Sequence, residues 1–363
     1  MSASLPLLPD ALRTWLHQHA EHLDTSTELA AQVLPQLAQA GLFGAGVPQH
    51  LGGHGGSVCD AIDAIAAVAQ RSVTAAFVFW GHRTFLEYVL QSPNAALQER
   101  WLSPLLQGER AGATGLSNAM KFLSGIESLQ IAATERGDGA WQLDGKLAWI
   151  TNLRKQGFVA AAAVTREGGA PPAIVSFAGE LAGVTRSPDL ELLALRSSST
   201  AAVRLDAVCI GAADVIHTDA RQFLPAVRPS FLGMQCGLSI GLARASLQAA
   251  HEAAESMRGQ LHERIEQLDH ELEMNIAQLM EGVTDGRFVS AAAPLFRLRL
   301  NLAYIVQQAV MLELQASGGR AYLQSPEQHF ARRLRESAFI PIITPSLTQL
   351  QMELQKHAAA ETA

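Results

Sequence analysis

Residues 141–152 read WQLDGKLAWITN, and this stretch decides which fold the sequence predicts. Two short apolar-rich runs, Trp141–Leu143 and Lys146–Trp149, lie on either side of Asp144-Gly145. An Asp-Gly pair is preferred in type I′ hairpin turns, because both central residues of such a turn need positive φ. The stretch therefore predicts two antiparallel strands joined by a tight turn.

More strands are predicted on both sides of this hairpin, where short apolar runs are separated by Gly, Asp and Pro clusters. Together they predict a compact β-domain over residues 113–223. The further runs are Ile131-Ala132-Ala133, Phe158-Val159-Ala160-Ala161 and Ala173-Ile174-Val175-Ser176-Phe177.

Helical periodicity flanks the β-domain on both sides. Residues 1–112 predict a helical domain with a glycine-rich loop at 41–56, and residues 224–363 predict a helical bundle. One apolar stripe in the bundle advances by alternating steps of three and four, and long helices bury such stripes within a bundle and between subunits. The stripe consists of Leu295, Leu298, Leu302, Ile305, Ala309 and Leu312.

Composition and motifs exclude several classes of protein. The 363 residues are 48% hydrophobic, enough for two or three packed units, and the net charge of −7 argues against nucleic acid as a partner. No segment has the length of a membrane span or the pattern of a signal peptide, so we expect a cytoplasmic protein. The three cysteines fit neither a disulfide framework nor a metal site, and His262 and His270 predict a solvated helix face without metal.

The order helix, strand, helix and several local strings resemble the acyl-CoA dehydrogenase superfamily over nearly the whole chain. The most specific match is Trp149-Ile150-Thr151-Asn152, which reproduces the family's WITN flavin string. The resemblance implies an α+β fold with an N-terminal helical domain, a middle β-barrel domain and a C-terminal four-helix bundle, and it implies FAD as cofactor. Weaker matches cover 41–55, 258–260, 315–322 and 332–336.

A flavin needs a flat apolar wall, and its ring nitrogens need hydrogen-bond donors. Trp149 can supply the wall, and the resemblance gives Thr151 the role of a hydroxyl donor toward the ring. It also places Leu116 and Ser117 near the flavin, although the rest of that family loop is absent. Ser346 stands where the family has an FAD-contacting Thr.

The phosphate half of FAD needs cations or a close backbone approach. Paired glycines leave room for a cofactor near the backbone, and an arginine can bind a pyrophosphate in fork geometry, in the family from the neighbouring subunit. Leu261-His262 replaces the Phe-Gly that completes one of the matching segments. The residues that the resemblance assigns to this half are Arg258, Gln260, Gln315, Gly318 and Gly319.

The family's catalytic base has no counterpart at its usual positions. Oxidation of a thioester at its α,β carbons needs a carboxylate that removes the α-proton while hydride leaves the β-carbon. The family places this Glu near the C-terminus, where this chain has Thr344, or early in the C-terminal domain, where it has Phe231. A hydroxyl cannot do this alone, so the base would come from elsewhere, and His82 and Glu87 in the first domain are candidates.

Three functions stay open on these residues. The first is an FAD-dependent dehydrogenase of acyl-CoA or a related thioester, which passes electrons to an electron-transfer partner. The second is a flavin-dependent monooxygenase of the same fold, which uses oxygen and needs no α-carbon base. The third is a non-catalytic homologue that binds flavin or only a partner subunit. The resemblance and the apolar stripes together predict a homodimer or homotetramer.

Overall fold

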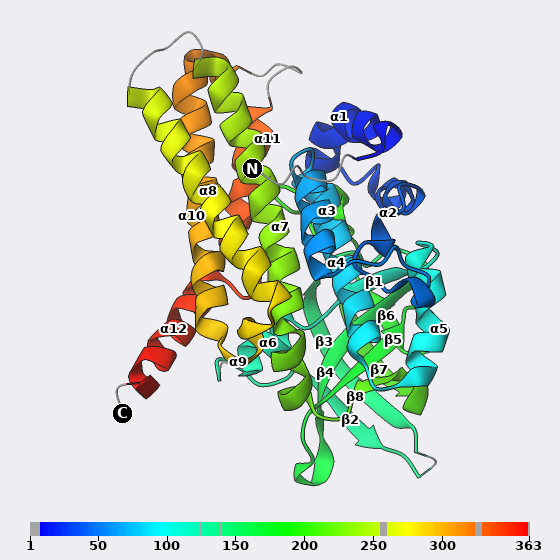
Figure 1. Ribbon diagram of the computed structural model, residues 1–363. Helices are drawn as coiled ribbons and strands as arrows, with labels where there is room; N and C mark the ends of the chain where they lie inside the picture. Colours follow the sequence, from blue (N-terminus) through cyan, green and yellow to red (C-terminus); the bar gives the residue numbers. More distant parts are fainter. Residues whose placement is uncertain (1–7, 124, 138, 255–259, 324–328, 362–363) are drawn as a thin grey trace.

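The computed structural model describes residues 8–361 except 124, 138, 255–259 and 324–328. Helices α1 to α5 come first, a curled mixed sheet follows, and helices α7 to α12 complete the chain (Figure 1). This arrangement confirms the predicted α+β class. The helices are α1 (Asp10–Thr25), α2 (Ala30–Gln39), α3 (Val58–Ala69), α4 (Val73–Gln91), α5 (Ala95–Leu106), α6 (Ser117–Leu123), α7 (Ala220–Ala254), α8 (Gln260–Thr284), α9 (Arg287–Ser290), α10 (Ala292–Ser317), α11 (Phe330–Phe339) and α12 (Leu347–Glu361). No helix in the described part of the chain is long and apolar enough to cross a membrane.

The sheet is organised around β4, whose first seven residues are buried apolar residues. β4 pairs in parallel with β1 along its first half and with β2 along its second half, and it pairs with β5 in antiparallel fashion. The strand order is β6-β7-β3-β2-β4-β5-β8. The strands are β1 (Ala111–Thr114), β2 (Ile131–Glu135), β3 (Trp141–Ile150), β4 (Phe158–Arg166), β5 (Ala173–Ala178), β6 (Val184–Arg186), β7 (Ala201–Ile210) and β8 (Val215–His217).

The predicted hairpin at Asp144-Gly145 is wrong, because β3 continues through it as one ten-residue strand. The pair lies at a β-bulge, where two steps along β3 are matched by three steps along β7. Gly145 has a φ of 147°, and a Cβ there would lie 2.1 Å from the carbonyl oxygen of Gln130. Asp144 completes the bulge by accepting a hydrogen bond of 2.7 Å from the Ala207 amide. The preference of the Asp-Gly pair for positive φ therefore serves a β-bulge here and not a hairpin turn.

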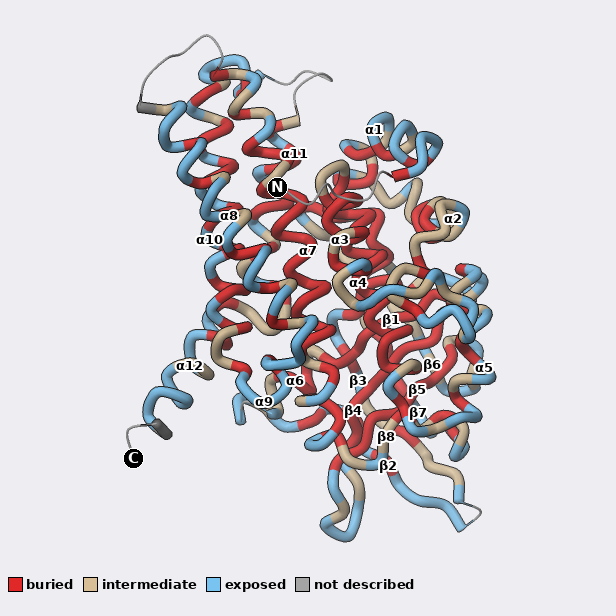
Figure 2. Tube along the Cα trace, viewed as in Figure 1, coloured by how far each residue is buried: buried red, intermediate tan, exposed pale blue. Residues whose placement is uncertain are grey.

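Helix α7 is the centre of the helical part, where it packs against α3, α4, α8 and α10 (Figure 1). All six residues of the predicted apolar stripe lie on α10 and are buried, which confirms the stripe. Figure 2 shows that buried residues run continuously from these helices into the sheet. The bundle and the sheet therefore share one continuous core.

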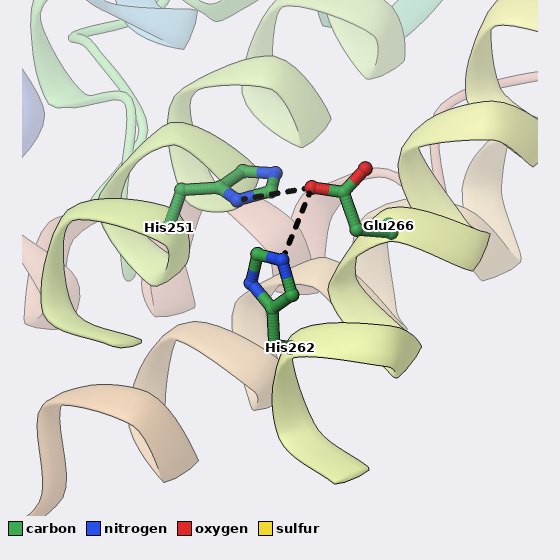
Figure 3. Close-up of side chains that lie close together, drawn as sticks. All are labelled: His251, His262 and Glu266. Carbon is green, nitrogen blue, oxygen red and sulfur yellow. Dashed lines mark ion pairs between the residues drawn. The ribbon is translucent and has the colours of Figure 1, made fainter. Parts of the chain in front are cut away.

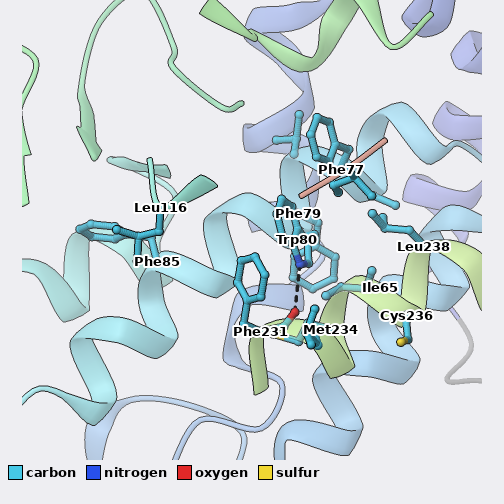
Figure 4. Close-up of a cluster of buried hydrophobic side chains, with 14 of the residues drawn as sticks. Ile65, Phe77, Phe79, Trp80, Phe85, Leu116, Phe231, Met234, Cys236 and Leu238 are labelled. Carbon is cyan, nitrogen blue, oxygen red and sulfur yellow. Dashed lines mark hydrogen bonds between the residues drawn. The ribbon is translucent and has the colours of Figure 1, made fainter. Parts of the chain in front are cut away.

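An aromatic cluster joins α4 to α7 inside this core (Figure 4). The indole of Trp80 donates a 3.4 Å hydrogen bond to the Phe231 carbonyl, and the two rings pack edge to face with centroids 5.3 Å apart. Phe77 stacks on Trp80 at 5.5 Å and meets Phe339 of α11 at 4.6 Å. Three helices are thereby fixed around one apolar surface.

Replacing Gly145 by Ala is expected to destabilise the fold by at least about 2 kcal/mol, because the new Cβ meets backbone at a positive φ. Urea denaturation followed by circular dichroism measures the free energy of unfolding. Gly137→Ala in the adjacent β2–β3 connection is the control, since nothing lies within 4 Å of its Cβ position. Equal stability of the two variants would contradict the strained bulge.

Candidate functional site

A cavity of about 630 Å³ opens where the sheet, α4 and the C-terminal helices meet. Phe77 and Trp80 of α4 and Phe231 of α7 line it with aromatic rings. Residues 335–352, at the end of α11 and the start of α12, and the loop 192–195 complete it. Small-molecule sites usually occupy about 300–1,000 Å³ and are mainly apolar, so this cavity has the size of a ligand site.

Large apolar side chains surround the cavity and remain exposed to solvent. Trp149 at the end of β3 is 64% exposed, and Leu193 and Ile342 are 78% and 69% exposed. Ile126 and Met352 are also exposed and line the same cavity. Contiguous exposed apolar surface usually marks a binding site. The indole of Trp149 therefore offers a flat face to a ligand.

Thr151 lies beside Trp149 on the cavity wall and is held by a tight turn after β3. Its hydroxyl donates to the Ser198 carbonyl over 3.2 Å and lies 3.0 Å from the Thr200 hydroxyl. Asn152 follows with a φ of 59°, and its side-chain amide donates to the Gly112 carbonyl over 2.8 Å. Since the Thr151 proton is directed to Ser198, the predicted bond from this hydroxyl to a flavin ring requires that proton to reorient.

The structure brings four of the predicted flavin contacts together. Trp149, Thr151, Ser117 and Ser346 all line the cavity, although they come from β3, α6 and the segment before α12. Leu116 is fully buried beside them and is not one of the described lining residues. The cavity thus collects residues separated by more than two hundred positions in the sequence.

Thr344 and Phe231, which occupy the family's two base positions, also line the cavity. The carbonyl of Thr344 accepts a 3.0 Å hydrogen bond from the Gln235 amide, whose oxygen accepts a 2.9 Å bond from Arg299. Arg299 also donates to the Ile340 carbonyl over 2.8 Å. Both Gln235 and Arg299 are fully buried, and burial lowers the pKa of the Arg299 guanidinium. This chain of bonds fixes the segment that carries Thr344.

The ionisable side chains among the described lining residues are cations. Lys121 lies 3.5 Å from Glu127, and Arg335 bonds Asp24 of α1 over 2.7 Å. Since Asp24 is buried, the pair ties α11 to the first helix. The cavity therefore combines apolar walls and hydroxyl groups with two cations that are each paired with a carboxylate.

The structure does not bring His82 to the cavity. The imidazole is fully buried in the middle of α4, where Nε2 lies 2.9 Å from the Leu105 carbonyl and Nδ1 accepts from the Gly112 amide over 3.0 Å. Burial lowers the pKa of His82 to about 4, so the ring is a neutral structural link between α4, α5 and β1. Glu87 is likewise buried and bonded to Arg83 at 2.7 Å, so neither side chain fits the predicted role of base.

The residues predicted for the phosphate half of FAD lie elsewhere. Gln315, Gly318 and Gly319 are at the C-terminal end of α10, where the Gln315 amide donates to the Met311 carbonyl and none of the three lines the cavity. Arg258 lies outside the described residues, as does the side chain of Gln260. This single chain therefore gathers only the half of the predicted site that faces the flavin ring.

Several lining residues had no predicted role. Leu193, Ile342 and Met352 lie in loops or in a short terminal helix, where sequence patterns do not reveal which surface a side chain faces. Phe77 and Trp80 belong to an aromatic run that is visible in the sequence. That aromatic run is the sequence feature that could have predicted this wall of the cavity.

Comparisons with known proteins show what the chain resembles in sequence and in fold. The model of the acyl-CoA dehydrogenase N-terminal domain matches residues 9–109. The probable acyl-CoA dehydrogenase YngJ of Bacillus subtilis is 26% identical over 257 residues, which cover 67% of this chain and 65% of YngJ. The match thus spans slightly less than two thirds of that relative.

Solved structures show the same fold over nearly the whole chain. Butyryl-CoA dehydrogenase from Megasphaera elsdenii is 20% identical with a TM-score of 0.77, covering 99% of this chain and 100% of that one. A nitrososynthase from Micromonospora carbonacea var. africana is 19% identical with a TM-score of 0.77, covering 96% and 94%.

The helix, sheet and helix arrangement with a cavity at its centre defines the class of acyl-CoA dehydrogenase-fold proteins. Residues 9–109 match the acyl-CoA dehydrogenase N-terminal domain, and the chain as a whole resembles the acyl-CoA dehydrogenase superfamily in sequence and in fold. The same fold also occurs in a protein that is named a nitrososynthase.

The burial of His82 predicts a loss of stability in acid. Its folded pKa of about 4 lies below the usual value of 6.5, so the unfolded chain binds the proton first as pH falls. The free energy of unfolding should therefore drop by about 3 kcal/mol between pH 7 and pH 4 because of this residue.

The new side chain in His82→Gln keeps a donor and an acceptor but does not titrate. The difference in free energy of unfolding between the wild type and this variant should therefore shrink as the pH falls from 7 to 4. Urea denaturation at each pH measures the difference. The control is His50→Gln at an exposed position. A difference from the wild type that stays constant with pH for His82→Gln would contradict a buried neutral imidazole.

Proposed function

We propose that the protein is a flavin-dependent oxidoreductase that binds a flavin ring against Trp149 and its substrate in the adjoining apolar cavity. The observation that carries this proposal is the joint position of Trp149 and Thr151 on the wall of a 630 Å³ cavity. An exposed indole beside a buried hydroxyl suits a planar aromatic ring with polar nitrogen atoms.

The residues of the chain fit the ring of this cofactor better than its phosphates. Trp149 supplies an apolar face, and Thr151 and Ser117 supply hydroxyls. The two lining cations are already paired, Lys121 with Glu127 and Arg335 with Asp24 and Glu21. When bound, a flavin supplies two-electron transfer, either from a substrate hydride or onward to oxygen. FAD, as opposed to a shorter flavin, stays a prediction, since its phosphate contacts would come from residues outside this cavity.

The chain itself provides a mainly apolar binding space. Phe77, Trp80 and Phe231 form one apolar wall of the cavity. The bonds from Arg299 through Gln235 hold the backbone of the Thr344 segment in place. These residues orient a substrate and do not exchange protons with it.

The lining favours an oxygen-using reaction over oxidation of a thioester. Lys121 and Arg335 cannot accept an α-proton while charged, and Thr344 and Phe231 stand where the family's carboxylate would be. A monooxygenase needs no such base. In that reaction one atom of O₂ enters the substrate and the other leaves as water. A reduced nicotinamide supplies a hydride, which carries two electrons and one proton, and the solvent supplies the second proton.

A thioester dehydrogenase is the second candidate, and the similarity to YngJ favours it. In that case the substrate is acyl-CoA or a related thioester, and an electron-transfer partner reoxidises the flavin. A base would then have to come from outside the described cavity wall. Homodimer or homotetramer assembly is proposed for either reaction.

Anaerobic and aerobic spectra of the flavin-loaded protein separate the two reactions. We expect the visible absorbance of the oxidised flavin to persist when acyl-CoAs of different chain lengths are added without oxygen. Chemical reduction followed by air should consume oxygen and restore this absorbance. Bleaching by an acyl-CoA would instead establish the dehydrogenase, and a protein that binds neither FAD nor FMN would overturn the oxidoreductase proposal.

Trp149→Ala should weaken flavin binding at least about tenfold while changing stability by less than about 1 kcal/mol, because the indole is exposed and makes its contacts with the ligand. Fluorescence titration with FAD and with FMN measures the affinity. Trp141→Ala on the same strand is the matched control, since Trp141 packs under Arg166 and is not a lining residue. Equal loss of binding in both variants would argue against a ring on Trp149.

A further inference from the structure

Two histidines and a glutamate converge where the end of α7 meets the start of α8 (Figure 3). His251 comes from α7, and His262 and Glu266 come from successive turns of α8. The atoms that could bind a metal all lie within 4.8 Å of one another. Nδ1 of His251 is 3.8 Å and Nε2 of His262 is 3.9 Å from the same carboxylate oxygen of Glu266.

We propose that His251, His262 and Glu266 form a binding site for a divalent metal of the zinc class, which joins the two helices. The site is separate from the cavity described above, since none of the three residues lines it. It is independent of the proposed flavin chemistry.

The ligand set decides which metal is expected. Two imidazoles and one carboxylate suit Zn²⁺, while Mg²⁺ and Ca²⁺ prefer shells made of oxygen atoms. Both ring nitrogens point toward one carboxylate oxygen, yet 3.8 and 3.9 Å are too long for hydrogen bonds. The three side chains therefore face one another without forming hydrogen bonds among themselves, so their lone pairs remain available to a cation.

The geometry is close to that of a bound site. Bonds of about 2.0–2.2 Å in a tetrahedral shell place neighbouring ligand atoms about 3.3 Å apart. The observed separations must close by about 0.5–1.5 Å, which side-chain rotation can supply because the three side chains are 33%, 60% and 58% exposed. His262 and Glu266 are four residues apart, so the helix itself fixes them on one face.

A water molecule can fill a fourth ligand position, because the site lies at the surface. Asp269 lies three residues after Glu266 on α8, but it does not belong to the cluster. His270 lies eight residues beyond His262 and does not belong to the cluster.

The expected role of the metal is structural. Its ligands lie on both sides of residues 255–259, so a bound ion would connect the end of α7 directly to the start of α8. A metal that binds the folded chain more tightly than the unfolded chain raises the melting temperature by mass action. Loss of the metal should therefore lower stability without changing the ligand cavity.

The test is calorimetric titration of ZnCl₂ into EDTA-treated full-length protein from which any affinity tag has been removed. We expect one Zn²⁺ per chain with a Kd of about 1 μM or tighter, a rise in Tm of about 3 °C in excess metal, and no comparable effect of MgCl₂. His251→Ala and His262→Ala should each weaken zinc binding at least about tenfold.

His270→Ala is the matched control, because it removes an exposed histidine from the same helix, and it should bind zinc as the wild type does. Circular dichroism confirms that each variant is folded. The proposal is overturned if the wild type shows no zinc heat, or if binding survives in the double variant His251→Ala/His262→Ala. It is equally overturned if His270→Ala loses as much affinity as the cluster variants.

Discussion

The buried guanidinium of Arg299 is the constraint on which the functional part of the structure depends. A charge removed from water needs hydrogen bonds, and two of the three guanidinium nitrogens of Arg299 have them, to Gln235 and to the Ile340 carbonyl, while Nη1 has no partner among the described residues. Gln235 in turn holds the carbonyl of Thr344. Displacing the segment 340–344 would leave a buried charge with fewer partners, so α7, α10 and the wall of the cavity keep one relative position.

The elements of the fold could be predicted where their sequence signals were local. The apolar stripe of α10 and the strands β4 and β5 follow from spacing and residue type alone, because each element buries one continuous apolar surface. Asp144-Gly145 misled because positive φ suits a bulge as well as a turn, and only the partner strand β7 distinguishes them. β7 itself has residues that alternate between buried and exposed, a signal that the prediction missed.

The site was predictable only in the parts that a motif covers. Trp149 and Thr151 belong to one string, so the resemblance found both, and Ser117 and Ser346 followed from their places in the same family pattern. Leu193 and Ile342 reach the cavity through loops, and their side-chain directions depend on contacts with distant elements. The His251 cluster was missed for the same reason, since His251 and His262 come together only when α7 and α8 pack side by side.

Helix α4 shows why a histidine beside an aromatic run was a misleading candidate. Trp80 faces the cavity, and the next residue, Gly81, passes so close to Thr151 that a Cβ would lie 2.8 Å from its methyl group. His82 follows at about 100° further around the helix and is directed to Leu105 and Gly112. The contact between α4 and β3 that positions Trp80 over the cavity therefore requires the imidazole to point into the core. Turning His82 toward the cavity would rotate Phe77 and Trp80 away from it, so with this register the helix supplies the aromatic wall and keeps His82 in the core.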